Sequence, residues 1–123
     1  MPSVLIVDDQ EEAAQALKEF FDLQGITSQA TADGDEVLKL FAEHQPDLVL
    51  LDIRLEGSRI DGLEILEEAR KRHVKSKIYV LTGYPDDATQ ARAMQLGADG
   101  YLVKPLGIDK LLELAKNING EKP

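Results

Sequence analysis

The chain has 123 residues, enough to bury one hydrophobic core but not two, and 43% of them are hydrophobic, as is ordinary for a globular domain. Its 23 acidic residues outnumber the 14 basic ones, and a net charge of −9 argues against direct binding to nucleic acid or to anionic membranes. The absence of cysteine excludes disulfides, thiol catalysis and thiolate metal sites. The first ten residues, MPSVLIVDDQ, fit neither a signal peptide nor a membrane span, so we expect a cytoplasmic protein.

Short apolar runs alternate along the chain with longer stretches that have the 3.6-residue period of amphipathic helices. In chain order, the sequence predicts a strand at 4–7, a helix at 11–24, a strand at 26–31, a helix at 33–46, a strand at 48–51, a helix around 63–69, a strand at 77–81, a helix from 86 to about 96, a strand at 101–103 and a helix at 108–118. Five strands alternating with five helices predict an α/β fold, with a doubly wound parallel sheet covered by helices on both faces.

Polar side chains follow several of these predicted strands. In open parallel sheets, sites lie beyond the carboxyl ends of the strands, near the point where the strand order reverses. Asp8, Asp9, Asp52, Thr82 and Lys104 all stand just past predicted strand ends. The sequence therefore predicts one shared site at this edge of the sheet.

Each of these residues also has a simple structural explanation. Asp8 or Asp9 could cap the first helix, and Asp52 could be a turn residue bonded to its own backbone. The Thr82 hydroxyl could be satisfied locally, and Lys104 could be a solvated loop lysine.

Taken together, the acids are harder to explain in this way. If the first and third strands are neighbours, three carboxylates crowd together, and each like-charge pair costs on the order of 1 to 4 kcal/mol. A hard divalent cation such as Mg²⁺, which prefers oxygen ligands, would account for the crowding. Lys104 and Thr82 would then suit a phosphoryl anion at the metal. Asp52 could be the nucleophile that forms an acyl phosphate.

Five motifs, in this order and spacing, resemble the receiver domain of two-component response regulators: VLIVDD, LVLLD, DGLEIL, YVLTG and GADGYLVKPL. The resemblance covers about residues 3–118, with 119–123 as a tail or the start of a linker, and implies one receiver domain over 1–123. It also implies a flavodoxin-like fold, with the five strands in the order 2-1-3-4-5.

The resemblance implies a role for each site residue. Asp52 would accept a phosphoryl group from a phosphohistidine on a sensor kinase or a phosphotransfer protein. Asp8, Asp9, Asp52 and the backbone carbonyl of Arg54 would hold Mg²⁺, or Mn²⁺ in its place. Lys104 would contact the phosphoryl group. Such a domain catalyses only its own phosphorylation and dephosphorylation, so we do not expect an enzyme.

The same resemblance implies a conformational switch. Thr82 would hydrogen-bond the phosphoryl group and Tyr101 would be the switch aromatic, with a cis peptide between Lys104 and Pro105. The face formed by the fourth helix, fifth strand and fifth helix would bind an output domain or a second copy of the chain. Arg54 and Tyr84 would flank the line along which water attacks the phosphorus, and we expect them to slow hydrolysis.

The chain departs from the family pattern after Asp52. Receivers usually read D-x-x-M-P-x-M-D-G, but here nine positions separate Asp52 from Asp61, the proline is absent and RLEGSRI fills the gap. The longer loop could alter metal affinity or partner choice. It could also be a tolerated surface insertion, since extra loop length costs little.

Three other readings stay open. A flavodoxin-like electron carrier would share the fold but needs a phosphate-binding loop after the first strand, where VDDQEE is acidic. A phosphatase with an aspartyl nucleophile would usually carry a second acid two residues later, where Arg54 stands. The third is a receiver-like module that binds partners without phosphorylation.

Overall fold

The computed structural model describes residues 3–118. In chain order its elements are β1 (Ser3–Val7), α1 (Glu11–Leu23), β2 (Thr27–Thr31), α2 (Gly34–Glu43), β3 (Leu48–Asp52), α3 (Gly62–Lys71), β4 (Lys77–Thr82), α4 (Asp87–Gln95), β5 (Gly100–Val103) and α5 (Ile108–Ile118). The predicted tail at 119–123 lies outside the described residues. No helix within residues 3–118 is long and apolar enough to cross a bilayer.

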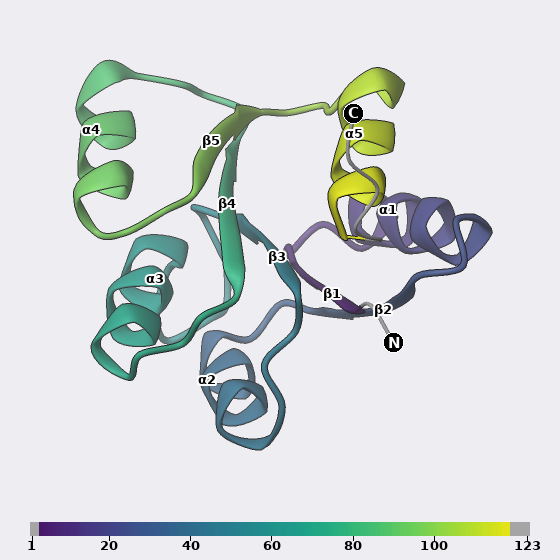
Figure 1. Ribbon diagram of the computed structural model, residues 1–123. Coiled ribbons are helices and arrows are strands. Elements are labelled where there is room, and N and C mark those ends of the chain that lie inside the picture. The colour runs from purple at the N-terminus through teal and green to yellow at the C-terminus, as the bar shows by residue number, and fades with distance from the viewer. Residues whose placement is uncertain (1–2, 119–123) are drawn as a thin grey trace.

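The five strands form one parallel sheet in the order β2-β1-β3-β4-β5. Helices α1 and α5 cover one face, and α2, α3 and α4 cover the other (Figure 1). The predicted doubly wound, flavodoxin-like fold is confirmed. The weakly apolar strand β2 is an edge strand, as its composition indicates.

The central strands are buried on both faces, which explains why they are continuous apolar runs. Along β1, Leu5 and Val7 face the core beneath α2 and α3, while Val4 and Ile6 face the core beneath α1 and α5. Burial of each such side chain contributes about 1.5 to 3 kcal/mol. The strands that carry the acidic residues at their carboxyl ends therefore contribute to the core on both faces of the sheet.

Strands β3 and β4 each continue one residue beyond the predicted end. Asp52 pairs in register with Leu81, and Thr82 pairs with Val103. The prediction that Asp52 and Thr82 stand just past the strands is therefore wrong by one position. The backbone of a strand's last residue can complete the ladder while its polar side chain lies at the edge of the sheet.

The start of α3 is pressed against the end of β3. A Cβ atom on Gly62 would lie 2.1 Å from the carbonyl oxygen of Asp52, a distance no side chain tolerates. The amide of Gly62 donates to the carbonyl of Ile53 at 2.9 Å. Glycine at the first position of α3 thus fixes the backbone on which the Asp52 carboxylate is carried.

Candidate functional site

Sheet order brings the three predicted acids together. Val7 pairs with Leu51, so the residues that follow each of them, Asp8 and Asp52, emerge side by side at the carboxyl edge. One carboxylate oxygen from each of Asp8, Asp9 and Asp52 lies within 4.8 Å of the other two. Asp8 and Asp52 are only 4% and 8% exposed, and Asp9 is half-buried. The predicted convergence of these carboxylates is confirmed.

Lys104 closes the site from the end of β5. Its Nζ atom lies 3.0 Å from Oδ2 of Asp8 and 3.1 Å from Oδ2 of Asp52. Its amide donates to the carbonyl of Thr82 at 2.8 Å, and the peptide bond between Lys104 and Pro105 is cis. The side chain is 20% exposed, so the explanation of Lys104 as a solvated loop lysine is wrong.

Burial and neighbouring charge shift the pKa of both members of this pair. Burial raises the pKa of the Asp52 carboxyl, the nearby Asp8 carboxylate adds to this, and the hydrogen bond from Lys104 opposes it. Burial alone would lower the pKa of Lys104, but the hydrogen bonds to Asp8 and Asp52 outweigh it and raise that pKa. Lys104 is therefore firmly charged, and one ammonium faces three acids.

The donor set fits a hard divalent cation. The three clustered acids offer only carboxylate oxygens, which suit Mg²⁺, whereas Zn²⁺ sites usually include histidine or cysteine. Arg54 lines the cavity around these acids, and its backbone carbonyl as a metal ligand stays a prediction. Mg²⁺ also keeps several water molecules, so a cluster of three acids is sufficient.

The simple structural explanations hold in part beside the functional ones. Oδ1 of Asp8 accepts from the amide of Gln10 at 2.9 Å, and Oδ1 of Asp52 accepts from the amide of Arg54 at 3.4 Å. The N-cap residue of α1 is Gln10, so neither Asp8 nor Asp9 is the cap, and that interpretation is wrong. The local bonds orient the carboxylates without removing them from the site.

Of the other predicted residues, Thr82 and Tyr84 line the cavity at the site, and Tyr101 lies on strand β5. Thr82 is buried, and its Oγ accepts from the amide of Tyr84 at 3.0 Å. The Tyr84 side chain is 78% exposed, with the Arg54 guanidinium 5.8 Å from the ring centroid. Tyr101 is half-buried against the core under α2 and α3, and its hydroxyl is buried with no hydrogen-bond partner among residues 3–118.

A cavity of about 860 Å³ opens at the site. Its polar end holds the three acids, Thr82 and Lys104. Its other wall is apolar and comes from α1, the segment between β5 and α5, and the start of α5, with Ala13, Ala16, Leu17, Leu106 and Leu111. No local sequence pattern marks this apolar wall, because its residues come from segments far apart in the chain.

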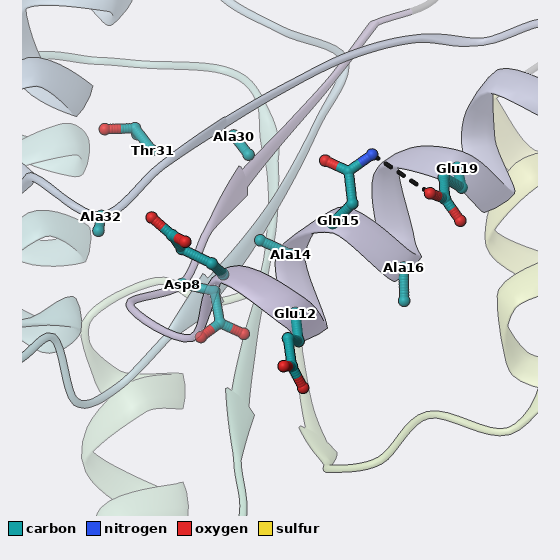
Figure 2. Close-up of a pocket in the computed structure, with 10 residues that line it drawn as sticks. Asp8, Glu12, Ala14, Gln15, Ala16, Glu19, Ala30, Thr31 and Ala32 are labelled. Atoms are coloured by element: carbon teal, nitrogen blue, oxygen red, sulfur yellow. Dashed lines mark hydrogen bonds between the residues drawn. The ribbon is translucent and has the colours of Figure 1, made fainter.

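A second depression of about 720 Å³ lies on the other side of Asp8, between α1 and the end of β2 (Figure 2). Its lining includes four alanines, Ala14, Ala16, Ala30 and Ala32, together with Glu12 and Glu19 of α1. Figure 2 shows Asp8 at one end and a Gln15–Glu19 hydrogen bond at the other. The depression is acidic and adjoins the cavity that holds Lys104, with Asp8 and Ala16 lining both.

Fold and site together define an α/β domain with a cluster of three acids and a lysine at the carboxyl edge of its sheet. The sequence matches the family model described as the response regulator receiver domain over residues 4–116. The chain belongs to this family of signalling domains, which disfavours a flavodoxin-like carrier.

Related proteins and similar solved structures support this family assignment. The chain is 35% identical over 108 residues to the regulatory protein AtoC of Escherichia coli (strain K12), covering 88% of this chain and 23% of AtoC. It is 36% identical over 113 residues to a putative NtrX-like response regulator of Rickettsia bellii, covering 92% of this chain and 24% of that protein. The receiver domain of NtrX from Brucella abortus superposes with a TM-score of 0.84 at 29% identity, covering 97% of this chain and 99% of that domain. The chain thus spans about a quarter of the length of these two curated relatives.

Proposed function

We propose that this domain accepts a phosphoryl group on Asp52 from a phosphohistidine donor and transmits the change to the surface of α4, β5 and α5. One observation carries the proposal: the Lys104 ammonium bridges the Asp8 and Asp52 carboxylates, beside a third acid whose oxygen lies within 4.8 Å. A charge arrangement of this kind suits a site that receives a cation and a phosphoryl anion together.

In the transfer, an Asp52 oxygen attacks phosphorus and forms a new P–O bond. The P–N bond to the donor imidazole breaks, and its electron pair returns to the ring nitrogen. Lys104 moves its hydrogen bond from Asp52 to a phosphoryl oxygen and keeps its bond to Asp8. A bound Mg²⁺ supplies positive charge that offsets the carboxylates and the phosphoryl oxygens.

Thr82 and Tyr101 would pass the signal on. When the Thr82 hydroxyl donates to a phosphoryl oxygen, its side chain shifts and its bond from the Tyr84 amide is strained or lost. Movement of Thr82 changes the space beside Tyr101, whose buried hydroxyl has no partner among the described residues to hold it. The partners we propose are a sensor kinase or phosphotransfer protein as donor, and an output domain or second copy as receiver of the signal. The cytoplasmic location stays a prediction.

Intact-mass measurement after incubation with acetyl phosphate and Mg²⁺ tests the proposal. We expect wild type to gain one phosphoryl group and Asp52→Asn to gain none, because an amide cannot form the acyl phosphate. Asp22→Asn, an exposed acid on α1, is the matched control and should label like wild type.

Three outcomes would contradict the proposal. Equal labelling of Asp52→Asn would place the phosphoryl group elsewhere. Absence of labelling in wild type, with Mg²⁺ shown to bind, would favour a module that works without phosphorylation. Sustained release of phosphate from a small phosphoester would instead favour the phosphatase.

A further inference from the structure

The lengthened loop after β3 is packed into the fold. It runs over residues 53–61, between Asp52 and the start of α3. Leu55 and Ile60 within it are only 7% and 8% exposed and belong to the core beneath α2 and α3. A loose surface insertion would leave such side chains in solvent.

The far half of the loop is attached to the N-terminus of α2. Oγ of Ser58 accepts from the amide of Gly34 at 2.9 Å and donates to the carbonyl of Ile60 at 2.8 Å. Nε of Arg59 donates to Oδ2 of Asp35 at 3.0 Å. The site of Gly34 is so close to Ile60 that a Cβ there would lie 2.5 Å from Cγ1 of Ile60. Two polar contacts and one apolar contact therefore hold this half in place.

The near half of the loop is a tight turn. The amide of Ser58 donates to the carbonyl of Leu55 at 3.2 Å, and Gly57 has a φ of +80°. A left-handed third residue is the signature of a type II turn, in which glycine is favoured at that position. Glu56 is then the second residue of the turn, whose amide is free to bond outside it.

That amide binds a site residue. The amide of Glu56 donates to Oδ2 of Asp9 at 2.9 Å, across 47 positions of sequence. Asp9 is the least buried of the three clustered acids, and repulsion from Asp8 and Asp52 would favour its rotation into solvent. The bond leaves Oδ1 of Asp9 available to a cation. The receiver pattern has proline where Glu56 stands, and a proline there would have no amide hydrogen to donate to Asp9.

We propose that the loop is a positioning device for Asp9: its attachment to α2 holds the turn, and the turn's Glu56 amide holds the Asp9 carboxylate ready for a divalent cation. The inference rests on the proposed function to the extent that Asp9 is a metal ligand. It assigns a purpose to the residues by which this chain departs from the receiver pattern.

The test compares Glu56→Pro with Glu56→Ala by calorimetric titration with MgCl₂. Both variants lose the Glu56 carboxylate, but only proline lacks the amide hydrogen, and proline is favoured at this position of a type II turn. We expect Mg²⁺ to bind the proline variant about tenfold more weakly than the alanine variant, as is typical when a group that orients a metal ligand is removed. The ¹³C shift of the Asp9 carboxyl in the metal-free protein should move in the proline variant alone.

Equal Mg²⁺ affinity of the two variants would overturn this inference while leaving the proposed function intact. Absence of Mg²⁺ binding by wild type would overturn both. If Glu56→Pro fails to fold, Ser58→Ala decides, because it removes the hydrogen bond to the Gly34 amide and loosens the loop without altering any of the three clustered acids. A weaker Mg²⁺ affinity with a moved Asp9 ¹³C shift supports the inference, and an unchanged affinity overturns it.

Discussion

At the scale of single residues, Asp52 is under opposing demands. It must be ionised to attack phosphorus, yet it is 8% exposed and faces a second buried acid, Asp8. Burial raises its pKa, and the ammonium of Lys104 works against that, helped by the hydrogen bond from the Arg54 amide. Since Lys104 bonds both acids, its loss would leave two close carboxylates without a counter-charge.

The raised Asp52 pKa predicts a pH dependence of stability. The folded protein keeps this proton over a range in which the unfolded chain, with a carboxyl pKa of 3.8, has lost it. Ionisation of Asp52 therefore opposes folding. The stability that the protonated carboxyl contributes is complete below the unfolded pKa and is lost as pH rises through the folded pKa. The loss is about 1.4 kcal/mol for each unit by which the pKa is raised.

The amide side chain of the Asp52→Asn variant has no carboxyl proton to lose. The unfolding free energy of the variant should therefore increase relative to that of wild type as pH rises from acid to neutral. Urea unfolding of both proteins without divalent metal, at several pH values, measures the difference. Parallel pH profiles of the two proteins would show that Asp52 is not the group responsible.

At the scale of elements, the ends of β3 and β4 matter most, because each supplies both a site residue and the backbone that holds it. Gly62 lets α3 begin directly against the Asp52 carbonyl, with no room for a side chain. The segments that follow β3 and β4 meet over the site, where Arg54 stacks on Tyr84. Each of these contacts gives a prediction of its own.

Gly62→Ala should destabilise the protein by about 3 kcal/mol, because a Cβ there displaces α3 or the end of β3. Gly107→Ala is the control: it lies in the segment between β5 and α5, and a Cβ there meets nothing within 4 Å. Urea unfolding of the two variants compares them directly. Equal stability would mean that α3 shifts at no cost.

Tyr84 and Arg54 should lengthen the lifetime of the phosphoryl group. A large, mostly apolar ring held by a cation can cover the phosphorus and exclude the attacking water. We expect Tyr84→Ala and Arg54→Asn each to speed dephosphorylation several-fold once the donor is removed, as measured by intact mass over time. Decay of Tyr84→Ala that is equal to wild type or slower would refute the shielding role.

At the scale of the whole molecule, the site and the proposed output face are neighbouring surfaces. The site lies at the carboxyl edge of the sheet, and the proposed output face is formed by the edge strand β5 with α4 and α5. Apolar side chains are exposed on α4, β5 and α5: Met94, Val103, Ile108 and Leu112. Tyr101 lies on β5, where it pairs with Val80, and Val103, two residues further along the strand, pairs with Thr82. A change at the phosphoryl site can therefore reach this face through one strand pair.

Addition of beryllofluoride and Mg²⁺, which imitate the phosphoryl group, should shift backbone amide resonances around Tyr101 and along α4 as well as at the site. Tyr101→Ala should keep the shifts at the site and lose those on α4. If wild type shows shifts near Asp52 and Lys104 alone, Tyr101 is a half-buried aromatic without a switching role.

The sequence alone determined the order and kind of every element, because runs of apolar residues and helical periods are local properties. It also predicted Asp8, Asp9, Asp52, Thr82 and Lys104 as one site, since parallel strands end at a common edge. Its errors were at the boundaries: Asp52 and Thr82 are the last residues of their strands because their backbones find partners on neighbouring strands.

Only the tertiary structure decided how these residues meet. The bond from Lys104 to Asp8 spans 96 positions and that from Glu56 to Asp9 spans 47, so no local pattern encodes either. The same holds for the loop after Asp52, where Leu55 and Ile60 are buried by helices whose positions depend on the completed sheet. Local periodicity sets which elements form, whereas contact between distant residues sets the charges, the pKa values and the fixed position of the ligands.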